Sequence, residues 1–477
     1  MQLKQAIRLS DTACLALSGS GGKTTAIFQL ARSLSNGRVS SKQGTGGQPV
    51  IVTATTHLHV DQVRLADTHW IGEEPDDLAG LEKNLQGVML VTGPVNEDRT
   101  RGLDNNTLTR LRAICEQHSL PMLIEADGSR QRPLKAPAGH EPPIPDFVET
   151  VVVVAGLSGL GRPLTEEFVH RPEIFGQLSG LAPGEIVTPD ALLRVLTHPD
   201  GGLKNIPPQA RRIVLLNQAD TPELQSIGGK LAQGLLAAFD AVIVGTLEPL
   251  HVQALEPTAG IILAAGEARR FGRLKQLLDY HGDPFVRTVV KTALAAGLSP
   301  VVVVTGAQAH AVEGAVHDYP ITITRNPDWQ DGQSTSIRAG LDALTPMLGA
   351  SPTPLPRGEG RDASPKFFEF GGGREGVGAA IFLLADQPQI TPTVIHALTE
   401  QHARTLAPIL APLVAGQRAN PVLFDCQTFP DLMELTGDVG GRAIFGKYPV
   451  TFLPWHDEGL LLDVDTPEDL ERLRNQE

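Results

Sequence analysis

The sequence has few cysteines and few aromatic residues, and it lacks long apolar runs. Its three cysteines, Cys14, Cys115 and Cys426, stand far apart and form no CxxC pair. This spacing argues against a disulfide framework or a structural zinc site. No run of about 18 apolar residues occurs, and the N-terminus lacks the basic and then apolar pattern of a signal peptide. We therefore predict a cytoplasmic protein that does not enter a membrane.

Basic residues are not in excess either. The chain has 40 Lys and Arg residues against 54 Asp and Glu residues, a formal net charge of −14. Because a nucleic-acid surface needs clustered positive charge, this balance argues against a nucleic-acid partner. Phosphate groups can still bind at helix N-termini, where backbone N–H groups need no net positive charge.

The length of 477 residues exceeds what one ordinary core accommodates. Glycine (49) and proline (37) are plentiful while aromatic residues make up only 4%, which favours many short strands joined by loops. We predict two domains, residues 1–250 and residues 258–477, with the boundary in the segment 247–258.

Short β-branched runs alternate with helical patterns, which is typical of parallel sheets with crossover helices. The sequence therefore predicts an α/β protein. The expected strands of the first half are 13–18, 49–54, 87–92, 121–126, 150–155, 212–216 and 241–245. Those of the second half are 260–264, 300–305, 321–325, 379–385, 407–413 and 460–464.

Two segments have compositions that cannot fill a core, 36–48 and 346–378. We interpret the second as a disordered loop inserted between a helix and a strand, without a catalytic role. A disordered regulatory segment is the alternative.

The segment GIILAAGEARRFGRLKQLL (residues 260–278) predicts a buried strand, a loop of small residues and then a helix. Small residues at the end of a parallel strand let the backbone approach a triphosphate closely. Arg270 and Lys275 would then supply positive charge to the α-phosphate and to the leaving pyrophosphate. A tight turn with surface basic residues is the alternative. The predicted nucleotide-binding residues are Leu263, Ala264, Ala265, Gly266 and Gly272.

This segment resembles the LAAGxSxRFGxxK motif of the MobA-like nucleotidyltransferases, and among them that of the molybdenum cofactor cytidylyltransferases. The chain reads LAAGEARRFGRLK, with Ala268 in place of the motif's serine. Guanylyltransferase relatives have glycine at the position of Ala265, so the resemblance implies CTP as the nucleotide. It also implies a Rossmann-like nucleotidyltransferase fold for this half.

The resemblance extends through the second half of the chain. The segment DGQSTSIRAGL (331–341) is similar to the family's base- and ribose-contacting segment, which implies that Ser336 donates to the pyrimidine; a helix N-cap is the alternative. Two further segments resemble those that hold the pterin-bearing substrate, with ordinary turns as the alternative. The substrate-binding residues implied there are Asn420, Pro421, Asp438 and Arg442.

Two aspartates at predicted strand ends are the candidate metal ligands. Asp386 ends the strand IFLLAD, and Asp463 and Asp465 share one face of the predicted strand 460–464. Mg²⁺ takes one or two protein carboxylates and fills its shell with phosphates and water. We predict Mg²⁺ on Asp386 and Asp463, with Asp386 also catalytic. Helix capping is the alternative for Asp386 and for Asp465.

The resemblance implies that the terminal phosphate of molybdopterin attacks the α-phosphorus of CTP in line and that pyrophosphate leaves. A phosphate monoester is already anionic at neutral pH, so no general base is needed. The protein then has to position the reactants and neutralise the transition state.

In the first half, GSGGKTT follows a predicted strand and opens a helix, as phosphate-binding loops do. It is close to the GTxGKTT form of ATP-dependent ligases, and it predicts a P-loop-type parallel sheet domain that binds ATP or GTP. Lys23 would reach the β- and γ-phosphates, and Thr24 would bind Mg²⁺. The predicted nucleotide-binding residues are Gly19, Gly21, Gly22, Lys23, Thr24 and Thr25.

Other strand ends of this half also carry polar residues. Glu125 and Asp127 follow one strand, where a carboxylate could contact Mg²⁺ or orient water. The segment NQAD (217–220) resembles the guanine-reading NKxD of GTPases, with a simple turn as an equally good interpretation. Lys135 lies in a proline-rich loop and is a candidate anion-binding residue, although a solvated loop is the favoured interpretation for it.

The stretches GSGGKTT, TATTHL and EADGSRQRPLKAPAGHEPPIP resemble the YqeC family, which is linked to maturation of selenium-dependent molybdenum hydroxylases. We predict a molybdenum cofactor cytidylyltransferase fused to an NTP-binding maturation domain, with a molybdenum hydroxylase as a candidate client. One alternative is nucleotidyl transfer to a sugar- or alditol-phosphate. The other is an NTP-switched chaperone that delivers finished cofactor.

Overall fold

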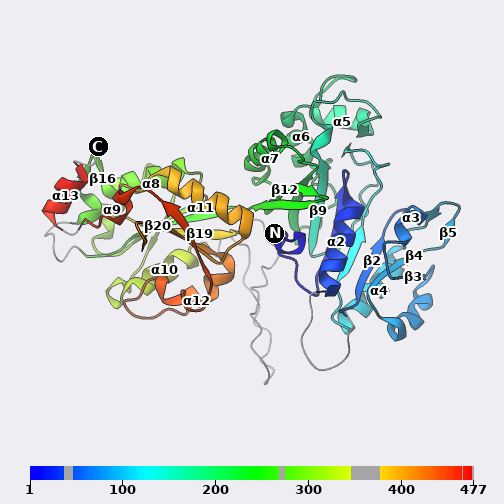
Figure 1. The fold of residues 1–477 in the computed structure, drawn as a ribbon, viewed down its shortest axis with the longest axis horizontal. Helices are drawn as coiled ribbons and strands as arrows, with labels where there is room; N and C mark the ends of the chain where they lie inside the picture. The colour runs from blue at the N-terminus through cyan, green and yellow to red at the C-terminus, as the bar shows by residue number, and fades with distance from the viewer. Residues whose placement is uncertain (37–46, 268–273, 345–375, 465, 475–477) are drawn as a thin grey trace. The chain divides into compact units, whose positions relative to one another are not determined.

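The apolar runs of the chain pair side by side into two large sheets, each within its own unit. The computed structural model describes residues 1–36, 47–267, 274–344, 376–464 and 466–474. Its contacts divide the chain into unit 1, Met1–Leu255, and unit 2, Glu256–Glu477. Strands and helices alternate in both units (Figure 1). The predicted α/β fold class is therefore confirmed.

Unit 1 contains a nine-stranded sheet in the order β13-β12-β11-β9-β1-β7-β2-β4-β3. All neighbours in this order are parallel except β12 and β13, which form an antiparallel pair. The strands are β1 (Cys14–Gly19), β2 (Val50–Ala54), β3 (Thr68–Ile71), β4 (Val88–Thr92), β7 (Met122–Glu125), β9 (Thr150–Gly156), β11 (Arg211–Asn217), β12 (Ala241–Leu247) and β13 (Leu250–Leu255).

Helices connect the parallel strands of unit 1, and several begin at a side chain that caps the first turn. Asp104, Thr188 and Thr221 each accept a hydrogen bond from a backbone N–H of the helix that follows, which satisfies a donor that the helix itself leaves open. Two short strand pairs lie outside the sheet, β5 (Val95–Asn96) with β6 (Arg99–Thr100), and β8 (Leu134–Lys135) with β10 (Val169–His170). The helices are α1 (Leu3–Ala6), α2 (Lys23–Asn36), α3 (Val60–Val63), α4 (Asn105–Gln117), α5 (Pro172–Ser179), α6 (Pro189–Thr197) and α7 (Pro222–Leu235).

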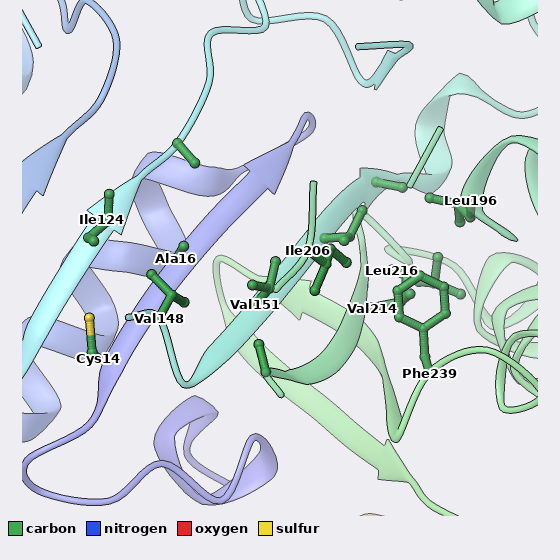
Figure 2. Packing of buried hydrophobic residues seen from close by; sticks show 14 of the residues in the cluster. Cys14, Ala16, Ile124, Val148, Val151, Leu196, Ile206, Val214, Leu216 and Phe239 are labelled. Carbon is green, nitrogen blue, oxygen red and sulfur yellow. The ribbon is translucent and has the colours of Figure 1, made fainter. Parts of the chain in front are cut away.

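One face of this sheet packs into a single apolar cluster. Alternate residues of a strand point to the same face, so Cys14 and Ala16 of β1 enter the cluster together with Val151 of β9 and Val214 of β11. Figure 2 shows these side chains together with Phe239, which follows α7 and belongs to the same cluster. The cluster includes residues of the strands from β4 to β12 in the sheet order, so it lies across most of the sheet.

Unit 2 contains an eight-stranded mixed sheet in the order β18-β17-β14-β19-β22-β20-β21, with β23 paired to β20. The strands β18, β17, β14 and β19 are parallel, whereas β22 runs antiparallel to both β19 and β20. The strands are β14 (Thr258–Ala264), β17 (Val301–Thr305), β18 (Thr322–Arg325), β19 (Ala379–Leu384), β20 (Ile409–Val414), β21 (Gln417–Arg418), β22 (Val422–Asp425) and β23 (Val450–Trp455). A short pair, β15 (Asp279–Tyr280) with β16 (Asp283–Pro284), lies outside it.

Helices cover both faces of the unit 2 sheet. Ile262 and Ala264 of β14 pack with residues of α8, α9 and α11, whereas Ala259 and Ile261 of the same strand pack with α10 and α12. This alternation explains why the strand is apolar at nearly every position. The helices are α8 (Phe285–Ala295), α9 (Ala309–Val316), α10 (Gln333–Asp342), α11 (Pro392–Thr405), α12 (Phe429–Met433) and α13 (Pro467–Arg474). Within the described ranges, no helix is long and apolar enough to cross a membrane.

The prediction of a strand at 460–464 is wrong. The chain there forms a 3₁₀ turn, η8 (Glu458–Leu461), and no strand follows it up to Val464. The turn begins because Asp457 accepts a hydrogen bond from the Gly459 N–H at 2.8 Å, and Leu460 is buried against the helices of unit 2. The apolarity of this run reflects burial of a turn.

Two other predicted segments need separate mention. The segment 247–258, predicted as the domain boundary, contains β13, and the division between the units falls after Leu255. The segments predicted to be disordered lie mostly outside the part of the chain that the structure describes. Val377, at the end of the longer segment, is described and buried.

Candidate functional site

In unit 1 the segment Gly19–Gly22, which we call the glycine loop, connects β1 to α2. Gly21 and Gly22 have φ angles of +84° and +129°, a region that residues with a Cβ rarely adopt. A Cβ on Gly21 would lie 2.5 Å from the Gly156 nitrogen, and one on Gly22 would lie 2.3 Å from Asn217 Nδ2. The loop therefore fits closely against the ends of β9 and β11, and only glycine suits these two positions.

Lys23, the first residue of α2, has its charge compensated inside the loop. Its side chain is buried, and its Nζ donates to the Gly19 carbonyl at 2.6 Å. The same Nζ lies 3.2 Å from Asp127 Oδ1, without the alignment of a hydrogen bond, while Asp127 Oδ2 accepts from the Gly19 N–H at 3.1 Å. Asp127 thus occupies the place beside Lys23 and the loop backbone that an anionic group would otherwise take.

Thr24 joins the loop to a second carboxylate. Its Oγ1 donates to Glu125 Oε2 at 3.1 Å and accepts from Gln62 Nε2 at 2.6 Å. Burial raises the pKa of Glu125, and Lys23 and Thr24 oppose that rise. The hydroxyl and the carboxylate together offer oxygen atoms of the kind that Mg²⁺ binds. Thr25, the remaining predicted residue, follows within α2.

Lys135 belongs to a buried charge network, so the solvated-loop interpretation is wrong for this residue. Its side chain is 2% exposed, and its Nζ lies 2.7 Å from Asp127 Oδ2 and 2.7 Å from Glu141 Oε2. Arg171 completes the network with two hydrogen bonds to Glu141, at 2.7 and 2.8 Å. Burial alone would raise the pKa of Glu141, but the hydrogen bonds from Arg171 and Lys135 outweigh it and lower the pKa to about 2.

A cavity of about 30 Å³ borders this network and is lined partly by Gly19, Asp127 and Lys135. It has room for roughly two water molecules. A nucleotide therefore does not fit inside this cavity.

In unit 2 the predicted cradle lies where two parallel strands end side by side. Leu263 of β14 pairs with Leu384 of β19, and the Ala385 N–H donates to the Leu263 carbonyl at 3.1 Å. Ala264 and Ala265 are buried. Beyond them, the Gly266 carbonyl accepts a hydrogen bond from Gln276 Nε2 at 2.9 Å. Small residues thus form this edge, where open α/β sheets bind ligands.

Three polar side chains meet next to this edge. Gln387 is buried and follows Asp386 directly after β19. Its Nε2 donates to Asp463 Oδ1 at 2.8 Å, and its Oε1 accepts from Asn420 Nδ2 at 3.2 Å. The structure therefore brings Asp463 and Asn420, which are far from Asp386 in sequence, onto the residue adjacent to Asp386. Pro421 is buried beside Asn420.

The short 3₁₀ helix η3 (Lys275–Leu277) begins with Lys275, the last residue of the motif, and continues with Gln276. Gln276 is buried, and its Oε1 has no hydrogen-bond partner among the described residues. The structure thus places one incompletely bonded amide beside the Gly266 carbonyl. Arg270 and Gly272, which the sequence predicts as parts of the site, lie outside the described residues, as does Asp465, for which helix capping is the alternative.

Ser336 lies in the first turns of α10 and is buried. Its Oγ accepts a hydrogen bond from Asn326 Nδ2 at 3.0 Å, and the same amide donates to Thr335 Oγ1 at 2.7 Å. Asn326 is itself tied to β17 through its N–H, which donates to the Thr305 carbonyl at 2.8 Å. Ser336 therefore keeps its own hydroxyl proton for another acceptor.

Asp438 contacts the first residue of α10 from a distant part of the sequence. Its Oδ1 accepts a hydrogen bond from the Gln333 N–H at 3.3 Å. Gly332 has a φ of +111°, and a Cβ there would lie 2.5 Å from the backbone of Asp438. Arg442 is exposed in η7 (Gly441–Ile444). Burial and the charge of Arg442 lower the pKa of Arg418, so these two guanidinium groups lie close to each other.

Sequence reasoning missed the amides Gln62, Asn326 and Gln387, each of which hydrogen-bonds at least one predicted site residue. The signal for Gln387 was its place directly after a strand-terminal aspartate. Gln62 and Asn326 carry no such signal, because neither belongs to a motif. Among the residues that the structure describes, no three His, Cys, Asp or Glu side chains form a cluster able to hold a metal by themselves.

These features define an α/β protein whose second unit is a nucleotidyltransferase. The model for the YqeC protein family matches residues 15–173, and the model for the MobA-like NTP transferase domain matches residues 260–451. The chain belongs to the YqeC family through its first unit, and its second unit is a MobA-like NTP transferase domain.

Relatives match one unit each or a part of it. Protein YqeC of Escherichia coli K12 is 31% identical over 232 residues, which cover 46% of this chain and 82% of that protein. Nicotine blue oxidoreductase of Paenarthrobacter nicotinovorans is 30% identical over 224 residues, 45% of this chain and 95% of that protein. The molybdenum cofactor cytidylyltransferase of E. coli K12 is 34% identical over 85 residues, 18% of this chain and 44% of that protein.

Proposed function

We propose that unit 2 transfers CMP from CTP to the terminal phosphate of the molybdopterin cofactor and releases pyrophosphate. The single observation that carries this proposal is the link from Asp463 through Gln387 to the end of β19, because it joins both predicted metal ligands to the edge where the LAAG segment ends. The similarity to a molybdenum cofactor cytidylyltransferase supports the choice of acceptor. The Ala265 position supports CTP.

The residues present fit a magnesium ion. A full protein cage is missing from the described residues, but Mg²⁺ needs only one or two carboxylates when phosphates and water complete its shell. Asp386 and Asp463 are the residues that would hold it. When bound, the ion neutralises charge on the phosphate oxygens.

The residues of unit 2 then have four tasks. The small residues 264–266 let the triphosphate lie close to the backbone, and Lys275 stabilises negative charge on the leaving pyrophosphate. Ser336, held by Asn326, donates to the pyrimidine. Asn420, held by Gln387, orients the acceptor together with Pro421, Asp438 and Arg442. No residue has to remove a proton, because the attacking phosphate is already anionic.

We also propose that unit 1 binds a nucleoside triphosphate on the glycine loop and serves maturation of a molybdenum hydroxylase. Lys23 would exchange its contact with Asp127 for the β- and γ-phosphates, and Thr24 with Glu125 would contact Mg²⁺. The close fit of Gly21 and Gly22 against the sheet supports this proposal, since it fixes the course of the loop backbone.

Incubation of the full chain with molybdopterin cofactor and each NTP in turn tests the proposal for unit 2. Among the four NTPs, we expect only CTP to give pyrophosphate release. Mass spectrometry should then detect a cytidylylated molybdopterin product. Asp386→Ala should lower the rate by about a hundredfold or more, since electrostatic stabilisation of the transition state is lost. Glu400→Gln, on the exposed face of α11, serves as the control and should react like the wild type.

The two alternatives give different results in the same experiment. Pyrophosphate release with sugar- or alditol-phosphates but not with molybdopterin would move the activity to those acceptors. The chaperone alternative would be supported by a different result. The wild type would then transfer no nucleotide but would deliver finished cofactor to a hydroxylase, and Asp386→Ala would deliver it equally well.

A further inference from the structure

The end of β11 carries an amide whose hydrogen bonding is incomplete. Asn217 is the last residue of this strand and is 6% exposed. Its Nδ2 donates to the Gly21 carbonyl at 2.7 Å, whereas its Oδ1 has no hydrogen-bond partner in the described part of the chain. Since a carbonyl only accepts, this bond fixes which end of the amide faces the glycine loop. A buried acceptor of this kind is costly unless a ligand supplies the donor.

A carboxylate stands three residues further on, in the loop before α7. Asp220 is exposed. The loop between the two residues is fixed: Gln218 has a φ of +60°, and its Oε1 accepts from Ser158 Oγ at 2.6 Å. The Ala219 N–H donates to the Gly245 carbonyl at 3.0 Å. Both acceptors, Asn217 Oδ1 and the Asp220 carboxylate, are thus carried by one braced turn.

This turn lies at the same edge of the sheet as the glycine loop. The strands β11, β9 and β1 are parallel neighbours in that order, so their carboxyl ends meet at one edge. The contact is direct, because a Cβ on Gly22 would come within 2.3 Å of Asn217 Nδ2. A nucleotide whose phosphates lie on the glycine loop would therefore have its other groups within reach of this turn.

Two hydrogen-bond acceptors on one turn select a base by the donors that it presents. Guanine presents two adjacent donor positions, its N1–H and its 2-amino group. Adenine and cytosine each present one amino group next to a ring acceptor, which would face the carboxylate unfavourably. We infer that unit 1 binds a guanine nucleoside triphosphate and that Asn217 and Asp220 read its base. This inference rests on the proposed binding of phosphates by the glycine loop.

The test measures binding of GTP, ATP and xanthosine triphosphate to the full chain by equilibrium dialysis with Mg²⁺. Excess unlabelled CTP fills the site of unit 2. The variants are Asp220→Asn, Lys23→Ala and, as the matched control, Glu223→Gln, which removes a neighbouring exposed carboxylate at the start of α7. Circular dichroism spectra verify that each variant is folded.

We expect GTP to bind at least about tenfold more tightly than ATP, because a hydrogen bond to a charged group is at stake. Asp220→Asn should lose about tenfold or more in GTP affinity and gain affinity for xanthosine triphosphate, whose 2-carbonyl accepts from the new amide. Glu223→Gln should bind like the wild type. Equal affinity for GTP and ATP, or an unchanged GTP affinity of Asp220→Asn, overturns the guanine inference. If binding is nevertheless lost in Lys23→Ala, the proposed phosphate site on the glycine loop stands. No Lys23-dependent binding of any nucleotide overturns both.

Discussion

At the scale of single residues, Gln387 holds the two ends of the unit 2 site together. It is the one described side chain that hydrogen-bonds both Asp463 and Asn420, and neither bond survives replacement by methionine, which has a similar shape. We predict that Gln387→Met lowers kcat/KM for CMP transfer by about tenfold to a hundredfold, since a hydrogen bond to a charged group is lost.

A positioning role has a further signature. If Gln387 orients Asp463, the Mg²⁺ concentration for half-maximal rate should rise in Gln387→Met, and excess Mg²⁺ should restore part of the rate. Titration of Mg²⁺ against pyrophosphate release measures this. A variant with an unchanged Mg²⁺ requirement would show that Gln387 contributes to stability alone.

Lys135 is the second residue on which a structural prediction depends. Replacing it with methionine leaves Asp127 and Glu141 buried with one partner fewer each. Breaking a buried ion pair in this way costs about 3 kcal/mol of the free energy of unfolding. The control is Arg64→Met, because Arg64 is 85% exposed and its contact with Asp61 is 3.9 Å long; we expect less than about 1 kcal/mol there. Urea denaturation followed by circular dichroism compares the two, and equal losses would refute the prediction.

At the scale of elements, the short pair of β8 and β10 places one histidine among cations. His170 pairs in register with Lys135 and precedes Arg171. Burial and the charges of Arg171, Lys135 and Arg130 lower the pKa of His170 to about 4, with Glu141 acting in the opposite direction. The neutral imidazole is therefore the form that the folded unit holds.

The sign of the pH effect follows from this lowered pKa. In the unfolded chain His170 takes up a proton near its usual pKa of 6.5, whereas the folded unit resists it. Stability is therefore complete above pH 6.5 and falls as the pH drops towards 4, by about 2 kcal/mol for a partly solvated group. We predict that His170→Gln, which does not titrate, loses less stability than the wild type over this range. Parallel pH profiles of the urea midpoint would contradict this.

Most elements of both sheets could be predicted from the sequence, because buried parallel strands are continuous β-branched runs such as those of β9 and β17. Several of the strands that sequence reasoning missed lack this signal, whereas the four-residue β22 is buried throughout and was still missed. Three of the four residues of β3 are only half-buried and the fourth is exposed, β13 mixes exposed with buried positions, and β23 has no fully buried residue. The segment 460–464 misled in the opposite way, since a buried turn is as apolar as a strand.

The same difference between local and distant information applies to the candidate sites. Motif residues such as Lys23 and Gly266 lie within four residues of a strand end in the structure, because an apolar run followed by small residues marks the end of a strand in the sequence. Contacts between distant segments, such as Gln387 with Asp463, depend on how loops return to the sheet. The sequence offers no local pattern for these contacts.

At the scale of the whole molecule, each unit has its own apolar core. The cluster shown in part in Figure 2 consists only of residues before Glu256, and the clusters on the two faces of the second sheet consist only of residues after it. The strand β13 completes the first sheet at Leu255, and β14 opens the second at Thr258. Neither sheet needs a strand from the other unit.

This separation predicts that a chain divided between Leu255 and Glu256 yields two folded proteins. Residues 256–477 should release pyrophosphate from CTP and molybdopterin with a kcat/KM within about threefold of the full chain, because unit 2 has its own sheet and its own apolar core. Residues 1–255 should retain the Lys23-dependent binding of nucleotide. A break after Asn217 is the control: it removes β12 and β13 from the first sheet and should leave an insoluble fragment. Activity lost on division at Leu255, with both pieces folded by circular dichroism, would show that the transferase site depends on unit 1.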